Sequence, residues 1–143
     1  MTTAASALYR EQVLDHGHAP RGVGCLPEPA RCATAHNALC GDRVRLSLQR
    51  EGDGIVALRH QSEGCLLCLA SASLMAEHLP GMSVADAAAW SSRLRRHLQA
   101  EDADALGPFA ALAGVAPHPG RHRCVLLPWE ALEQLLHQAA DAP

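Results

Sequence analysis

The sequence predicts an α+β fold, in which a small three-stranded antiparallel sheet packs helices on one face. Residues 42–62 carry alternating apolar and polar side chains on both sides of a turn at Glu51–Gly54, which is typical of a β-hairpin. After Gly64 the segments are longer and rich in helix-forming residues. With 143 residues and no linker or repeat, residues 1–143 are expected to form a single domain.

The first elements precede the hairpin. Residues 5–16 are predicted to form a helix because Tyr9 and Val13 have the i, i+4 spacing of one helix face. Glycines and prolines through residues 16–29 predict a loop. A short third strand is expected at 31–38, from the weakest pattern in the chain.

The hairpin itself has the clearest pattern. Val44, Leu46 and Leu48 alternate with polar residues along the first strand, 42–50, and the return strand is predicted at 55–62. One face of the hairpin is therefore expected to be buried under helices.

Four helices are expected after the hairpin, and each has a start or stop signal. Pro80 ends the first, Ser83 caps the second with Asp86 in its first turn, and Gly107 interrupts the third. Pro128 is expected in the first turn of the last helix, where its missing N–H costs little. The predicted ranges are 65–79, 83–100, 102–113 and a final helix after a loop at 116–120.

Composition excludes several classes of function. The net charge of −3 gives no electrostatic basis for binding nucleic acid or an anionic membrane. No apolar run approaches the roughly 20 residues of a membrane span, and the first residues lack the features of a signal peptide. The expected location is therefore cytoplasmic, where six reduced cysteines indicate metal or sulfur chemistry more than a disulfide framework.

Three polar groups are expected to converge at one end of the hairpin. Cys40 and Asp42 share the strand face of Val44, and Cys65 comes just after the return strand ends beside them. A carboxylate in phase with the core is costly without a partner, and a metal ion would supply one. The alternative that Asp42 caps a turn remains open at this point, as does the alternative that Cys65 is a small buried apolar residue.

The remaining cysteines have different interpretations. Cys124 is expected just before the last helix and follows Arg121 and Arg123 in the sequence. It offers a further thiolate whose charge the arginines could offset, unless they are solvated loop charges. A redox dithiol of Cys65 and Cys68 is disfavoured because the strands read as an antiparallel hairpin and not as a βαβ unit. A closed structural zinc site is a further alternative. Cys68 is interpreted as a bystander packed beside the core, and Cys25 and Cys32 as structural or incidental.

Four ordered blocks resemble one family. The blocks read LYREQVLDHGHAPRGVG, HNALCGDRVRLSL, EGCLLCLASASLM and GRHRCVLLPWEAL. They are similar to the IscU, SufU and NifU-N proteins of iron–sulfur cluster assembly, over nearly the whole chain. The resemblance implies the SufE/NifU-like α+β fold and a metal site made of three cysteines and an aspartate, matching Cys40, Asp42, Cys65 and Cys124.

Branch-specific features resemble SufU. Arg123 stands where IscU-type proteins have a histidine, the chaperone motif is absent, and the interval from Cys65 to Cys124 is longer than in IscU. The resemblance implies bound Zn²⁺ and Cys40 as acceptor of persulfide sulfur, with Arg121 guiding the thiol or a partner. The implied partners are a SufS-like cysteine desulfurase and a downstream iron–sulfur assembly complex.

A second function would use the same four residues. In this alternative the protein is a non-enzymatic scaffold that transiently holds iron or a 2Fe–2S cluster through Cys40, Cys65 and Cys124. It would then not be a sulfurtransferase-like persulfide carrier. Three departures from the family pattern stand out: Pro128 close to the third cysteine, Ala38 in place of a common proline, and Cys68 in place of a common serine.

Overall fold

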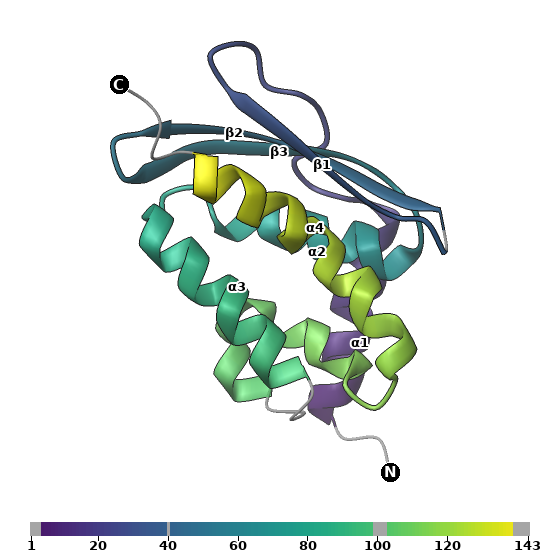
Figure 1. Ribbon diagram of the computed structural model, residues 1–143. Coiled ribbons are helices and arrows are strands. Elements are labelled where there is room, and N and C mark those ends of the chain that lie inside the picture. The colour runs from purple at the N-terminus through teal and green to yellow at the C-terminus, as the bar shows by residue number, and fades with distance from the viewer. Residues whose placement is uncertain (1–3, 40, 99–102, 139–143) are drawn as a thin grey trace.

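The computed structural model describes residues 4–39, 41–98 and 103–138. Its elements follow the predicted order (Figure 1). They are α1 (Ala4–His18), β1 (Arg31–Asn37), β2 (Asp42–Glu51), β3 (Gly54–Glu63), α2 (Leu66–His78), α3 (Val84–Leu98), the 3-10 helix η1 (Ala103–Val115) and α4 (Pro119–Gln138).

The three strands form one antiparallel sheet in the order β1-β2-β3, as predicted. The first strand has a weak sequence pattern because its core-facing residues are small or polar. Ala33, Ala35 and Asn37 point inward and are buried, while the residues between them are more exposed. The alternation is therefore present in burial although it is faint in hydropathy.

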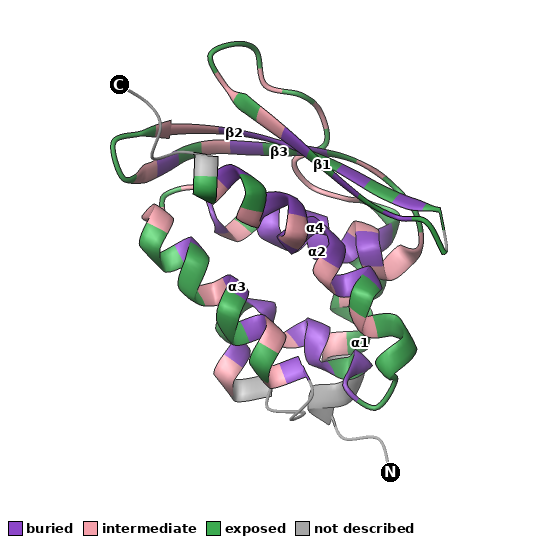
Figure 2. Cartoon of the chain, in the orientation of Figure 1, coloured by how far each residue is buried: buried purple, intermediate pink, exposed green. Residues whose placement is uncertain are grey.

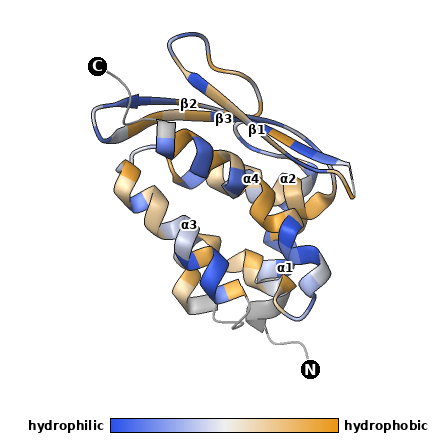
Figure 3. Cartoon of the chain, in the orientation of Figure 1, coloured by the Kyte–Doolittle hydropathy of each residue, from blue (hydrophilic) through white to orange (hydrophobic). Residues whose placement is uncertain are grey.

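The helices cover one face of the sheet, which confirms the predicted layer arrangement (Figure 1). α4 packs on β1 and β2, and α2 packs on β3. Figure 2 shows buried residues on the sheet and on these two helices, and Figure 3 shows that many residues of α2 are hydrophobic. Trp129 of α4 and Phe109 of η1 meet edge to face, with ring centroids 4.9 Å apart, and both are fully buried. α2 and α4 are thus the helices that connect the sheet to the rest of the core.

The opposite face of the sheet is crossed by the segment that joins α1 to β1. This segment pairs with the edge of β3, where the amide of Gly24 donates to the carbonyl of His60 at 2.9 Å. It then reaches β2, where the amide of Leu26 donates to Ser47 Oγ at 3.0 Å. Ser47 is consequently buried although it lies on the outer face.

The start of α4 differs from the prediction. The helix begins at Pro119, within the expected loop, and Pro128 lies inside it, so the expectation that Pro128 occupies the first turn is wrong. Proline fits the first position of a helix because its φ is already helical and its missing N–H would have no partner there. Pro119 takes that position, and Cys124 consequently lies in the second turn and not before the helix.

The predicted signals in the other helices hold. Ser83 Oγ accepts the amide of Asp86 at 3.0 Å and so caps α3. The expected break occurs at Gly107, which has φ 51° and sits against Trp90, 2.6 Å from where a Cβ would lie. Within the described part of the chain, no helix is both long and apolar enough to span a membrane.

Candidate metal centre

Three side chains from different elements meet at one end of the sheet. They are Asp42 at the start of β2, Cys65 at the N-cap of α2, and Cys124 in α4. One ligand atom from each lies within 4.8 Å of the others. The hairpin and its return into α2 bring the first two together, as the sequence predicts, and α4 adds the third.

Asp42 is buried, with 4% of its surface exposed, and its two oxygens differ. Oδ1 accepts the backbone N–H of Cys65 at 3.2 Å, so the carboxylate does help to fix a backbone turn. Oδ2 is buried and has no hydrogen-bond partner among the described residues. An unpaired buried carboxylate oxygen is costly, and a cation bound beside it would remove that cost.

The donor set fits a thiophilic divalent metal. Two thiolates bound to one tetrahedral zinc ion are about 3.8 Å apart, given zinc–sulfur bonds of about 2.3 Å. The ligand atoms of Asp42, Cys65 and Cys124 therefore need to move by only about 1 Å to close around an ion. Two cysteines and one carboxylate leave one position of a tetrahedral site for a further ligand.

Gly64 is a part of the site that the sequence analysis did not identify. A Cβ at this position would lie 2.6 Å from Asp42 Oδ1 and 2.7 Å from its Cγ. Only glycine allows the chain to pass this close to the carboxylate. A glycine directly before a candidate ligand was the available signal, but its neighbour across the hairpin could be known only from the structure.

Cys40, the predicted fourth ligand and sulfur acceptor, lies outside the described residues. The turn around it is held by Asn37, whose carbonyl accepts the amide of Gly41 at 2.8 Å. Asn37 Oδ1 also accepts the amide of Leu39 at 3.1 Å, and Gly41 has a φ of 77°. Leu39 is 96% exposed at the tip of this turn.

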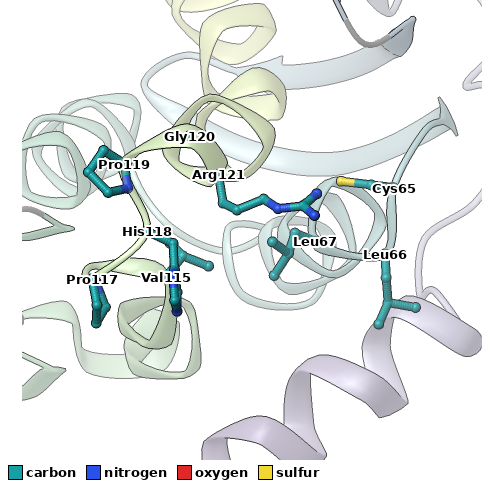
Figure 4. Close-up of a pocket in the computed structure, with 9 residues that line it drawn as sticks. All are labelled: Cys65, Leu66, Leu67, Val115, Pro117, His118, Pro119, Gly120 and Arg121. Atoms are coloured by element: carbon teal, nitrogen blue, oxygen red, sulfur yellow. The ribbon is translucent and has the colours of Figure 1, made fainter.

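Arg121 lies near Cys65, at the start of α4. It lines a pocket of about 870 Å³ together with Cys65 and residues at the start of α4. Figure 4 shows its guanidinium group pointing across the pocket toward Cys65. It can add positive charge beside the thiolates, and its role in guiding a thiol or a partner stays a prediction.

Three residues that lie close to Cys124 or Cys40 in the sequence have different surroundings from Arg121: Arg123, His122 and His36. Arg123 reaches Glu130, with Nη2 and Oε2 3.8 Å apart, so its charge is shared within α4. His122 Nε2 lies 3.0 Å from the carbonyl of Val115, which orients its ring toward η1. His36 is exposed and lines a smaller pocket beside Asp42.

The other described cysteines, Cys25, Cys32 and Cys68, are not part of the cluster. Cys68 is fully buried in the core, one turn after Cys65. Cys25 is exposed in the loop over the outer sheet face, and Cys32 is half-buried on β1, opposite Ser47 in the register. The interpretation of Cys68 as a bystander, and of Cys25 and Cys32 as structural or incidental, stays a prediction.

Comparisons with known proteins match most of the chain. The model of the NifU-like N-terminal domain matches residues 8–125. The zinc-dependent sulfurtransferase SufU of Bacillus subtilis strain 168 is 35% identical over 130 residues, covering 89% of this chain and 88% of that protein. The iron-sulfur cluster assembly scaffold protein IscU of Streptococcus pyogenes serotype M1 is 31% identical, covering 94% of this chain and 86% of that protein.

A solved structure agrees with the fold. The N-terminal part of a nitrogen-fixing NifU-like protein from Brucella abortus superimposes with a TM-score of 0.83 at 23% identity, covering 98% of this chain and all of that one. The chain belongs to the NifU-like N-terminal domain family of iron–sulfur cluster assembly proteins.

Proposed function

We propose that this protein is a zinc-dependent sulfur acceptor that takes persulfide sulfur from a cysteine desulfurase and passes it to the iron–sulfur assembly machinery. The observation that carries the proposal is the buried Oδ2 of Asp42, which has no hydrogen-bond partner among the described residues, in a cluster with Cys65 and Cys124. The name of the Bacillus subtilis relative, a zinc-dependent sulfurtransferase, supports the same function.

Four residues would hold the metal in this proposal. Asp42, Cys65 and Cys124 supply three ligands, and Cys40 is the candidate for the fourth. A bound zinc ion would keep the cysteine ligands deprotonated at neutral pH while limiting their reactivity. Asp42 is held for this role by the N–H of Cys65 on one oxygen, which leaves the other oxygen directed at the site.

Cys40 is the proposed acceptor because the resemblance to SufU-type proteins implies this role, and its sequence neighbour Leu39 is exposed to solvent. Its thiolate attacks the terminal sulfur of the desulfurase persulfide. A new sulfur–sulfur bond forms on Cys40, the donor sulfur–sulfur bond breaks, and its electron pair leaves on the desulfurase cysteine as a thiolate. The step consumes one persulfide and one thiolate and produces one of each, so no oxidant or reductant is needed.

The surface around the site supports a protein partner. Leu39 places an apolar side chain in solvent beside Cys40, where it can enter an apolar socket of the desulfurase. Arg121 offers a positive charge in the pocket that Cys65 also lines. A persulfide donor carries negative charge, so an arginine at this position favours its approach.

A second candidate is a scaffold on which a 2Fe–2S cluster is assembled. The similarity to the IscU scaffold over most of both chains favours it, and the same ligands would serve. Arg123 argues for sulfur transfer because IscU-type proteins have a histidine at the matching position, and a histidine is an additional potential metal ligand.

The test uses the purified protein with its bound metal, a cysteine desulfurase and cysteine. Intact-mass and peptide mass spectrometry should find one added sulfur atom, on Cys40. Cys40→Ser should abolish that mass, and Cys68→Ser should leave it unchanged as a matched cysteine replacement. Zinc bound to protein that never gains sulfur on Cys40 would refute sulfur transfer, and a stable cluster formed on anaerobic iron loading would favour the scaffold.

A further inference from the structure

A buried serine links the two helices that carry the cysteine ligands. Ser71 of α2 is fully buried, and its Oγ donates to the backbone carbonyl of Val125 in α4 at 2.6 Å. The same Oγ accepts the indole N–H of Trp129, one turn further along α4, at 3.1 Å. Val125 directly follows Cys124, and Ser71 lies fewer than two helical turns after Cys65.

Pro128 makes this link important at Cys124. In an α-helix the carbonyl of Cys124 would accept the N–H of residue 128, but proline has no N–H. The helix ladder is therefore interrupted at the residue that carries the ligand. Ser71 of α2 donates a hydrogen bond to the next carbonyl along α4, that of Val125. Trp129, which directly follows Pro128, donates its indole N–H to Ser71 Oγ and so holds the serine in place.

We propose that Ser71 is a positioning residue for the metal site, because it fixes the separation of the Cys65 and Cys124 sulfurs across the α2–α4 contact. The inference rests on the metal site of the proposed function. Residues that orient metal ligands through hydrogen bonds commonly affect metal affinity about 10- to 100-fold, although they never touch the metal.

Ser73 provides a matched control on the same helix. Like Ser71 it is a fully buried serine whose Oγ makes two hydrogen bonds. Its partners are His16 Nδ1 at 2.7 Å and the amide of Arg21 at 2.8 Å, both on the N-terminal side of the chain. Ser71→Ala and Ser73→Ala therefore make the same chemical change at equal burial, but only the first removes a contact with α4.

The experiment measures zinc affinity by competition with a chromophoric chelator, together with the absorption bands of the Co²⁺-substituted protein. Both variants are expected to lower the melting temperature of the metal-free protein. Only Ser71→Ala should weaken zinc binding by about 10- to 100-fold and alter the cobalt bands. A purely structural role would not change the affinity at a temperature where the variants stay folded, because a folded fraction near one leaves the apparent Kd unchanged.

A second pair of variants tests the hydroxyl if Ser71→Ala does not fold. Ser71→Thr and Ser71→Val add side chains of nearly equal shape, so any crowding in the core is shared between them. Only threonine keeps the donor for the Val125 carbonyl. The threonine variant should bind zinc at least about 10-fold more tightly than the valine variant.

The outcomes separate the two proposals. Equal zinc affinities in the Ser71→Ala and Ser73→Ala proteins, or in the threonine and valine proteins, would overturn the role of Ser71 and leave the metal site standing. A wild-type protein that binds no zinc would overturn the metal site and, with it, the positioning role.

Discussion

Two polar clusters in the interior of this molecule differ in whether their hydrogen-bonding groups all have partners among the described residues. The first, here called the N-terminal anchor, consists of His16, Arg21, His60, Ser62 and Ser73. In it Ser73 Oγ binds His16 Nδ1 and the amide of Arg21, while His60 Nε2 donates to the Arg21 carbonyl at 2.9 Å. His60 Nδ1 contacts Ser62 Oγ at 2.8 Å. The second cluster is the Asp42 site, where a buried oxygen has no hydrogen-bond partner in the described chain.

The difference indicates what each cluster is for. Hydrogen-bonding groups that all find partners within the protein fix the backbone, and in the anchor they fix the segment that follows α1. A cluster that keeps one oxygen unsatisfied gives up stability in the metal-free protein and becomes satisfied when it binds an ion. Substitutions should therefore lower stability in the first cluster and metal binding in the second.

The largest expected effect is at Asp42. Asp42→Asn preserves the shape and the acceptor for the Cys65 N–H, but it removes the negative charge next to the unpaired position. Zinc affinity should fall by more than about 100-fold, beyond the range typical of residues that only support ligands. The metal-free variant should melt at or above the wild-type temperature, as scanning calorimetry can test. A variant that retains zinc but unfolds earlier would place Asp42 with the structural anchor.

Gly64→Ala should have the next largest effect. The new Cβ would press against the Asp42 carboxylate and displace it from the site. Zinc affinity should fall by about 10- to 100-fold, measured by chelator competition. Gly120→Ala is the control, because a Cβ at Gly120 meets no atom within 4 Å and should leave zinc affinity unchanged.

Lowering the pH should destabilise the N-terminal anchor. Burial lowers the pKa of His60 most strongly, and the hydrogen bond to the Arg21 carbonyl only partly opposes it. Burial is also the main cause of the lowered pKa of His16. Because the unfolded chain binds these protons more readily, stability is complete above the ordinary histidine pKa of about 6.5 and falls as the pH drops below it.

Denaturant titrations of the metal-free protein between pH 7.5 and 5 would measure that slope. Each histidine can contribute at most about 1.4 kcal/mol per pH unit. His60→Asn should reduce stability at neutral pH and flatten the decline in acid. An unchanged slope would show that protonation of His60 is not what destabilises the folded protein.

The smallest expected effect is at Leu39. Leu39→Ser removes an exposed apolar side chain next to the proposed acceptor without touching the core. Stability and zinc content should stay unchanged, while the desulfurase concentration needed for half-maximal sulfur transfer should rise by about 5- to 30-fold, corresponding to about 1–2 kcal/mol of lost contact. Val56→Ser, at a second exposed apolar residue, is the control and should have no effect on transfer.

Local patterns predicted most of the fold and part of the site. The hairpin register follows from alternation, and it accounts for the meeting of Asp42 and Cys65. The start of α4 was missed because two prolines could each open a helix and Pro119 stood in a segment that read as a loop. Which proline begins the helix depends on packing against η1 and α2, which no local pattern records.

The supporting contacts could not be predicted because they join residues far apart in the chain. Gly64 has to be glycine only because Asp42 lies against it across the hairpin. Ser71 and Ser73 are both serines of the Ala-Ser-Ala-Ser run in α2, and Ser71 differs from Ser73 in facing α4. Such roles depend on tertiary distance and not on residue type.

X-ray absorption at the zinc edge tests the central claim most directly. Protein purified with zinc should give one ion per chain, with three sulfur ligands at about 2.3 Å and one oxygen ligand at about 2.0 Å. Asp42→Asn should remove that zinc signal, and His60→Asn should leave it intact. A first shell dominated by nitrogen, or the same sulfur and oxygen shell in the Asp42→Asn protein, would contradict the assignment of the unsatisfied carboxylate as a metal ligand.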